Sequence, residues 1–261
     1  MDRSASPALM QYQGGKSRIA RDIAAIITGG TDAVSRREIP DCRGDCAEHP
    51  QSGGGGTFVS LFCGGGAVEE RVTGFSHMVL NDEHPYLIAL YRGVQAGYNL
   101  PGDLTKEEYQ YIREHKEEDP VLTGFAGFGC SFGGKWFGGY ARNDKANNYA
   151  LETKNALARA MKNLGGADFL CGDYRLVAIP PRSVIYADPP YKGTTGYNRR
   201  KFNTDYFWDY MRVLGRNGHT LYISEMEAPE DFRCVWSKEF RRTLNKNQAM
   251  IATEKLFTYG G

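Results

Sequence analysis

The stretch "TFVSLFCGGGAVEERV", residues 57–72, is an apolar run that ends in three consecutive glycines. A short apolar run bounded by a glycine turn is typical of a buried strand, and the residues after the turn predict a helix. The stretch "HMVLNDEHPYLIALYRGVQAG", residues 77–97, predicts a second strand, which ends at Asn81 and Asp82, and a second helix. Strand, turn, helix and strand in this order form a βαβ unit and predict an α/β fold with a parallel sheet.

The rest of the chain adds further elements of both kinds. Apolar residues at helical spacing predict a helix over 17–28, with Ser17 as a candidate N-cap. A charged helix is predicted over 104–117 and another helix over 147–163. Residues 124–144 are rich in glycine and aromatic residues but have no clean period, and residues 29–56 are polar and glycine-rich, which predicts a flexible insertion. Further strands are predicted in "ADFLCGDY" (167–174), "SVIYADPPY" (183–191), "HTLYISEM" (219–226), "FRCVWSKEF" (232–240) and "IATEKLFTY" (251–259).

Composition limits the classes of function. The 261 residues suggest one large domain or one domain with an insertion, and the apolar fraction of 41% can fill a core. The formal net charge of +1 excludes a generally basic arm, so any contact with a polyanion must come from local patches. No stretch approaches the roughly 18 apolar residues of a membrane span, and the start lacks an export signal. We therefore expect a cytoplasmic protein with no membrane partner.

The cysteines favour neither disulfides nor metal. Six cysteines are spread along a chain with no export signal, which argues against a disulfide framework. Cys42, Cys46 and His49 form C-x3-C-x2-H, but a structural zinc site needs four ligands and no second cluster follows. We expect ordinary thiols in a surface loop and no metal.

The segment "MQYQGGKSRI", residues 10–19, invites comparison with a phosphate-binding loop because of Gly15, Lys16 and Ser17. That loop requires a glycine five residues before the second glycine, preceded by a strand. Met10 stands at this position and no apolar run precedes it. The spacing therefore excludes a nucleoside triphosphatase of this type.

Four motifs lie at or beside the predicted carboxyl ends of strands, where open α/β sheets bind ligands. "FCGGG" (62–66) lets a ligand approach the backbone, although a tight structural turn explains it equally well. Asp82 can hold two ribose hydroxyls, or it can cap the following helix. Asp173 and Tyr174 suit the amino group and the face of a purine, and a simple turn is the alternative reading. "DPPY" (188–191) is the most specific of the four.

The DPPY segment fits one chemical task. The prolines lack N–H groups and have a fixed φ, so the Asp188 carboxylate and the Pro189 carbonyl can both accept hydrogen bonds from one amino group. Tyr191 can stack on a flat ring. A proline turn capped by Asp188 is the structural alternative.

Together these motifs resemble those of the Dam-like DNA adenine-N6 methyltransferases, especially the small phage-encoded members. The resemblance rests on "YQGGK" near the start, "FCGGG" as a variant of F-x-G-x-G, "LND" after it and "DPPYKGTTGY" late in the chain. "GFGCSFGGKWFGGYAR" also resembles a segment of the phage members. The chain departs from the family in its polar insertion, and in "FVSLFCGGG", where the family commonly has Glu-Pro before Phe.

The resemblance implies a Rossmann-like methyltransferase fold that uses S-adenosylmethionine (SAM) and needs no metal. Residues 1–100 and 165–261 would form the catalytic domain, and 101–164 the target-recognition region. The residues then expected to contact SAM are Tyr12, Gly14, Gly15, Lys16, Phe62, Cys63, Gly64, Gly66, Asp82, Asp173, Tyr174 and Asp188. Catalysis would fall to Asp188, Pro189, Pro190 and Tyr191.

The implied reaction is methyl transfer to an adenine flipped out of double-stranded DNA, with strict or relaxed site specificity, by a monomer or weak dimer. Basic residues among aromatic ones supply the expected DNA contacts, which are Lys135, Trp136, Arg142, Lys192, Thr195, Tyr197 and Arg199. The segment 125–142 is expected near the flipped base, unless Phe128, Phe132 and Trp136, spaced by four, form a core stripe.

Two rival functions remain open from the sequence. One keeps the fold and methylates RNA adenine or DNA cytosine at N4, although Asp188 in place of serine favours adenine. The other is a nucleic-acid-binding relative without catalysis, against which the intact "DPPY" argues.

Overall fold

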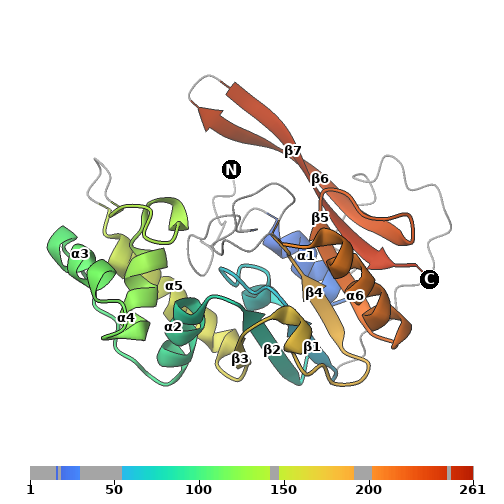
Figure 1. The fold of residues 1–261 in the computed structure, drawn as a ribbon, viewed down its shortest axis with the longest axis horizontal. Helices are drawn as coiled ribbons and strands as arrows, with labels where there is room; N and C mark the ends of the chain where they lie inside the picture. The colour runs from blue at the N-terminus through green and yellow to red at the C-terminus, as the bar shows by residue number, and fades with distance from the viewer. Residues whose placement is uncertain are drawn as a thin grey trace.

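The computed structural model describes residues 16, 19–29, 55–141, 147–190, 202–245 and 248–260, with backbone alone for 240–245 and 248–252. They contain one seven-stranded sheet in the order β3-β2-β1-β4-β5-β7-β6 (Figure 1). β3, β2, β1, β4 and β5 are parallel, and β7 is antiparallel between β5 and β6. The strands are β1 Thr57–Ser60, β2 His77–Asp82, β3 Asp168–Cys171, β4 Val184–Ala187, β5 Thr220–Glu225, β6 Phe232–Asn245 and β7 Gln248–Tyr259.

Both faces of the central strands β1, β4 and β5 are largely buried, whereas the edge strand β3 is partly exposed. Phe58 and Leu80 enter one core cluster, whereas Val59 and Ile185 enter the other. This alternation follows from the two-residue period of a strand. The sheet therefore needs helices on both sides.

Within the described ranges, three helices cover the first face of the sheet and one covers the second. α1 (Ala20–Ile27), α2 (Pro85–Gln95) and α5 (Tyr149–Leu164) contribute buried residues to the cluster of Phe58. α6 (Thr204–Arg216) packs with Val59 on the other face. The shorter helices α3 (Lys106–Glu114) and α4 (Pro120–Gly124) lie beside the sheet, at the left of Figure 1. No helix in the described ranges is long and apolar enough to cross a membrane.

The α/β architecture and the parallel sheet are confirmed, but some local predictions were wrong. α1 begins at Ala20 with Ile19 as its N-cap residue, so Ser17 does not cap it. The helix predicted after the glycines is only the 3-10 turn η1 (Glu69–Arg71). Gly66 adopts a positive φ of 63° and Val72 is already extended, which leaves no room for a longer helix. α6 was not predicted.

The predicted flexible insertion at 29–56 falls almost wholly outside the described residues. The division of the chain at 101 and 164 also stays a prediction. Within the described residues, α5 shares a core cluster with α2 and the strands, and Asn163 Nδ2 donates to the Glu70 carbonyl at 2.8 Å.

Close backbone contact joins α2 to α4 and the π-helical turn η2 (Phe125–Gly129). A Cβ on Gly124 would lie 2.1 Å from the Tyr86 carbonyl oxygen. A Cβ on Gly93 would lie 2.6 Å from Val121. Glycine at these positions is therefore required by the approach of one helix to the other.

Gly124→Ala is expected to lower the free energy of unfolding by about 1–3 kcal/mol, the usual cost of overpacking. In an open helical position the same change would stabilise the protein. Denaturant unfolding of this variant measures the sign, and Gly102→Ala is the control because its Cβ would meet only Leu151 at 4.0 Å. A Gly124→Ala protein at least as stable as wild type would contradict the packing.

Glu69 is a buried acid that connects η1 to β1. Its side chain accepts a hydrogen bond from Ser60 Oγ at 2.7 Å, and the residue is 2% exposed. Burial raises the pKa of the Glu69 carboxyl from 4.5 to about 8, although the bond from Ser60 opposes the rise and nearby Asp188 adds to it. The native protein therefore favours the protonated acid.

Because the native pKa of Glu69 is the higher one, its contribution to stability is full below about pH 4.5 and is lost as the pH rises through about 8. Glu69→Gln mimics the neutral acid and keeps the acceptor for Ser60. We expect the stability of wild type to fall relative to this variant across that window, by at most about 1.4 kcal/mol per pH unit. Denaturant unfolding at several pH values measures it, and parallel curves would contradict a neutral Glu69.

Candidate active site

The site lies where the strand order changes direction. From β1 the chain passes to β2 on one side, while β4 pairs with β1 on the other, with Ser60 opposite Tyr186. Leu61 N donates to the Tyr186 carbonyl at 3.0 Å, so the pairing continues past the end of β1. The glycine turn 62–66 and the segment 188–190 therefore leave the sheet side by side, at the switch point where such sheets bind ligands.

Asp82, the last residue of β2, fastens the glycine turn to that strand. Its Oδ2 accepts from Gly64 N at 3.0 Å and its Oδ1 accepts from His84 N at 2.9 Å. Burial raises the pKa of the Asp82 carboxyl to about 6, while these two bonds oppose the rise. The N-cap residue of α2 is His84, which makes no side-chain cap, so the helix-cap alternative for Asp82 is wrong.

The glycine turn itself is held from several sides. Gly64 and Gly66 have φ values of 46° and 63°, which favour glycine. Cys63 N donates to the Asn81 carbonyl at 2.8 Å, and the Tyr91 hydroxyl donates to the Gly64 carbonyl at 2.6 Å. These contacts position the turn without any ligand.

An aromatic group borders the turn. The rings of Phe62 and Tyr174 are 4.9 Å apart, and both side chains are half-buried. The Asp173 carboxylate already accepts hydrogen bonds from Arg175, one from the backbone N–H at 3.0 Å and others from the guanidinium. This pairing lowers the pKa of the Asp173 carboxyl. A purine amino group would have to share Asp173 with Arg175.

Lys16 is brought to Asp188 from the far end of the chain. Its Nζ lies 3.3 Å from Asp188 Oδ1 and 2.7 Å from Glu254 Oε2. The Lys16 side chain is 4% exposed and that of Asp188 is 21% exposed. Next to Asp188, Pro189 is buried and Pro190 is half-buried. The lysine is thus a buried cation between two carboxylates.

The surroundings of Asp188 favour its neutral form more than water does. Burial raises the pKa of the Asp188 carboxyl to about 6; the Lys16 cation opposes this rise and the Glu254 charge adds to it. Glu225, the last residue of β5, has a pKa raised to about 7, also mainly by burial. Charged Asp188 is therefore favoured only above about pH 6.

The glycine and aromatic segment after α4 reaches the same end of β2. Trp136 stacks on Tyr86 at 5.3 Å between ring centroids and meets the His84 ring at 4.4 Å. Phe128 is fully buried, whereas Phe132 is 70% exposed, so the proposed core stripe is wrong for Phe132. Lys135 is exposed.

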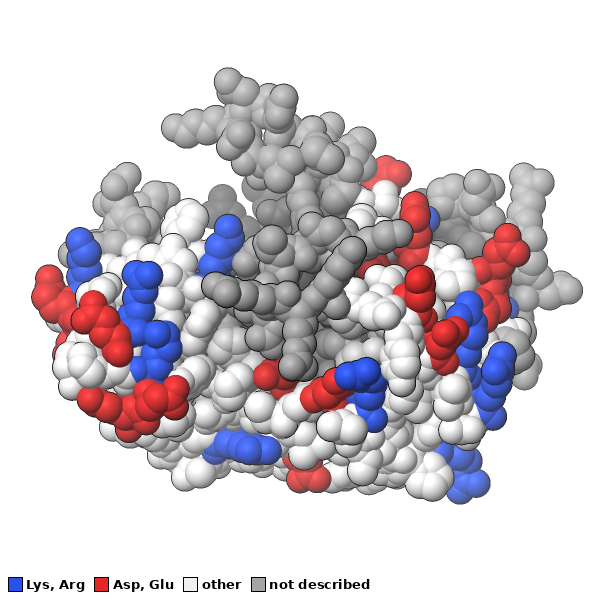
Figure 2. Space-filling view, in the orientation of Figure 1, with Lys and Arg blue, Asp and Glu red and all other residues white. Residues whose placement is uncertain are grey.

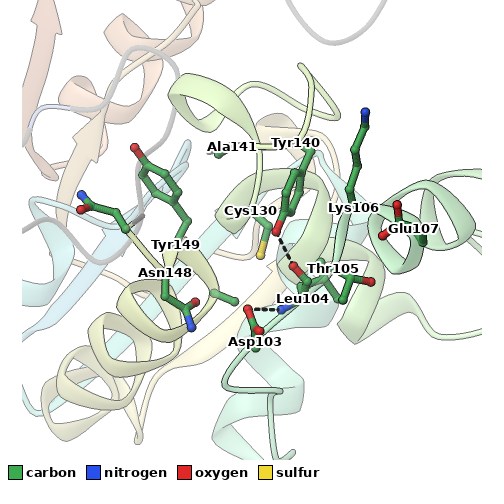
Figure 3. A pocket seen from close by; sticks show the side chains of 12 residues that line it. Asp103, Leu104, Thr105, Lys106, Glu107, Cys130, Tyr140, Ala141, Asn148 and Tyr149 are labelled. Atoms are coloured by element: carbon green, nitrogen blue, oxygen red, sulfur yellow. Dashed lines mark hydrogen bonds between the residues drawn. The ribbon is translucent and has the colours of Figure 1, made fainter. Parts of the chain in front are cut away.

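A cavity of about 490 Å³ lies apart from these residues, where α3 and α5 begin (Figure 3). Tyr140 closes one side by donating from its hydroxyl to the Leu104 carbonyl at 2.5 Å, and Leu104 N donates to Asp103 at 2.9 Å. None of the residues expected at the cosubstrate site lines it. We therefore place the candidate active site at the switch point.

Surface charge is mixed on the described part of the face in Figure 2, where lysine and arginine alternate with acidic side chains over α3 and its neighbours. Among the basic residues expected to meet DNA, only Lys135 can be placed. The expected site residues outside the described ranges are Tyr12, Gly14, Gly15, Arg142, Tyr191, Lys192, Thr195, Tyr197 and Arg199. Cys42, Cys46 and His49 lie outside them too.

Sequence reasoning missed three acids near Asp188. Glu225 could have been found, because it ends a strand as Asp82 does. Glu69 follows the glycine turn and reads as an ordinary helix residue. Glu254 is 238 residues away from Lys16 in the chain, and no local pattern indicates their contact.

Comparisons with known proteins identify the family. The model of the "D12 class N6 adenine-specific DNA methyltransferase" matches residues 44–121 and 133–256. Comparison with curated proteins gave no match.

Two solved structures are similar only weakly. A conserved hypothetical protein of Streptococcus pyogenes is 10% identical, with a TM-score of 0.33, over 79% of this chain and 87% of that one. A proposed RNA methyltransferase of Pyrococcus horikoshii is 9% identical, with a TM-score of 0.41, over 93% of this chain and 82% of that one.

The family match covers most of the chain, including the glycine turn, Asp82 and "DPPY". It confirms the methyltransferase fold and the resemblance read from the motifs, and it favours DNA adenine over RNA or cytosine. SAM is the methyl donor that this family implies. The chain belongs to the D12 class of N6 adenine-specific DNA methyltransferases.

Proposed function

We propose that methyl transfer takes place at the β1–β4 switch point, with Asp188 as the acceptor for the target amino group. The observation that carries this proposal is the position of Asp188. It follows β4 directly, beside the glycine turn, and pairs with Lys16 through Oδ1 at 3.3 Å. Among the described residues, no hydrogen bond to its Oδ2 is recorded, so this oxygen can accept from a substrate.

The residues around the turn fit SAM. Each Asp82 oxygen accepts one backbone N–H and keeps a lone pair for a ribose hydroxyl. Phe62 and Tyr174 offer an aromatic surface for the adenine, and the Lys16 ammonium suits the carboxylate of the methionine part. When bound, SAM supplies a methyl group activated on a sulfonium. Gly64 and Gly66 complete the cosubstrate site in this proposal.

Asp188 and the Pro189 carbonyl act on the adenine nitrogen, which is a poor nucleophile because its lone pair is delocalised into the ring. Two hydrogen bonds accepted from the amino group favour a pyramidal nitrogen with a localised lone pair. The Asp188 charge also stabilises the positive charge that develops there. Holding the reacting groups in line supplies a further part of the acceleration, on the order of 7–11 kcal/mol in favourable cases.

The substrate is proposed to be double-stranded DNA, from which the adenine is flipped because a stacked base cannot reach Asp188. Tyr191 would replace the lost stacking. Lys135 and Trp136 lie on the segment that contacts His84, two residues beyond Asp82, which supports a DNA contact near the site. The protein is proposed to act as a monomer or weak dimer, without a metal.

Asp188→Ala is expected to abolish methyl transfer while the protein stays folded, because the amino group loses its charged acceptor. Incorporation of labelled methyl groups into adenine-containing DNA measures the effect. Asp209→Ala is the control, since that aspartate is largely exposed on α6. A folded Asp188→Ala protein with a near-normal rate would remove Asp188 from catalysis.

Asp82→Ala is expected to weaken SAM binding about tenfold or more, because a hydrogen bond to a charged group is worth about 1.5–3 kcal/mol. Calorimetric titration measures the dissociation constant, and the melting temperature monitors the glycine turn that Asp82 holds. Asp103→Ala, at the cavity of Figure 3, serves as the control with unchanged binding. An unchanged constant for Asp82→Ala would limit Asp82 to a structural role.

A further inference from the structure

Lys16 binds a carboxylate on the last strand more closely than the aspartate of the catalytic segment. Its Nζ is 2.7 Å from Glu254 Oε2 and 3.3 Å from Asp188 Oδ1. The Glu254 side chain is 8% exposed, compared with 21% for Asp188. Glu254 is thus both closer to the ammonium and more deeply buried than Asp188, and a buried charge requires a partner. The Lys16–Glu254 contact is therefore the stronger of the two constraints on the ammonium.

Both ends of this contact are fixed by the fold. The Lys16 carbonyl accepts from Ile19 N at 2.9 Å and from Ala20 N at 2.8 Å, which ties the lysine to the start of α1. Glu254 lies on β7, opposite Lys238 of β6, and Lys238 Nζ pairs with Asp22 of α1 at 2.8 Å. A second ion pair thus joins the same helix to the same hairpin.

We propose that Glu254 is a positioning residue that restrains the Lys16 ammonium, so that Asp188 keeps an acceptor oxygen for the target amino group. This inference rests on the proposed role of Asp188. Without the Glu254 charge, the Lys16 ammonium still lies 3.3 Å from the Asp188 carboxylate and loses the attraction that holds it to Glu254. Lys16 then closes on Asp188 and competes with the substrate for it.

The charged groups around Asp188 determine the direction in which its pKa should change in the test. Lys16 lowers the pKa of the Asp188 carboxyl and Glu254 raises it. The acids Glu225 on β5 and Glu69 on η1 interact with it as well, as does the phenol of Tyr186 on β4. Removing the Glu254 charge while Lys16 moves closer lowers the pKa of Asp188 by both effects.

The test compares Glu254→Gln with wild type by the single-turnover rate of methyl transfer to DNA, at saturating SAM, from about pH 5 to 8. The matched control is Glu239→Gln, an exposed glutamate on the other strand of the same hairpin. We expect the plateau rate of Glu254→Gln to fall about tenfold, the scale of a weakened charged hydrogen bond. We also expect its acidic limb to move to lower pH, with the control unchanged.

Other outcomes overturn the proposal. An unchanged rate and limb would show that Glu254 does not position Lys16, and a lower rate with an unmoved limb would indicate general structural damage. If Glu254→Gln does not fold, Glu254→Asp replaces it, since its carboxylate is withdrawn by one methylene. A smaller change of both quantities in the same direction is then expected, and identity with wild type contradicts the proposal.

The proposed function fails separately from this inference. If Asp188→Ala has no effect on methyl transfer, the proposed role of Asp188 is overturned and, with it, that of Glu254. If Asp188→Ala abolishes methyl transfer but Glu254→Gln leaves the rate unchanged, only the proposed role of Glu254 is overturned.

Discussion

The parallel pairing of β1 with β4 is the constraint on which the site depends. The chain continues from β1 to β2 on one side of β1 and returns to β4 on the other, so the segments 62–66 and 188–190 emerge next to each other at one edge of the sheet. Parallel strands present their carboxyl ends at one edge, and each strand here contributes to it. Asp82 and Glu225 end their strands, and Asp188 begins the segment after its own.

Around this edge the protein buries charge, which is costly unless the charges are paired. Lys16 pairs with both Asp188 and Glu254, yet burial raises the pKa of the Asp188 carboxyl, and the Glu254 charge adds to the rise. Lys16, the first described residue, is thereby connected both to Asp188 and to the last strand. Through Glu254, the hairpin of β6 and β7 borders the candidate active site besides completing the sheet.

Local features of the fold and the site could be predicted from the sequence, whereas contacts between residues distant in the chain could not. The turn at 62–66, the strand end at Asp82 and the "DPPY" segment were recognisable because each follows an apolar strand with residues of distinctive chemistry, namely glycines, a carboxylate or prolines. The Lys16–Glu254 contact was not, because only the tertiary fold brings these residues together. The helix after Gly66 was overpredicted, since a positive φ and an early extended residue end it, and the Asp173–Arg175 pair lay hidden in an ordinary turn.

A crystal structure of the protein with bound S-adenosylhomocysteine tests the central claim most directly, because it locates the cosubstrate site without any variant. The account predicts the ribose hydroxyls at Asp82, the adenine beside Phe62 and Tyr174, and the carboxylate near Lys16. Binding in the cavity lined by Asp103 and Tyr140, or anywhere else away from the β1–β4 edge, would contradict it.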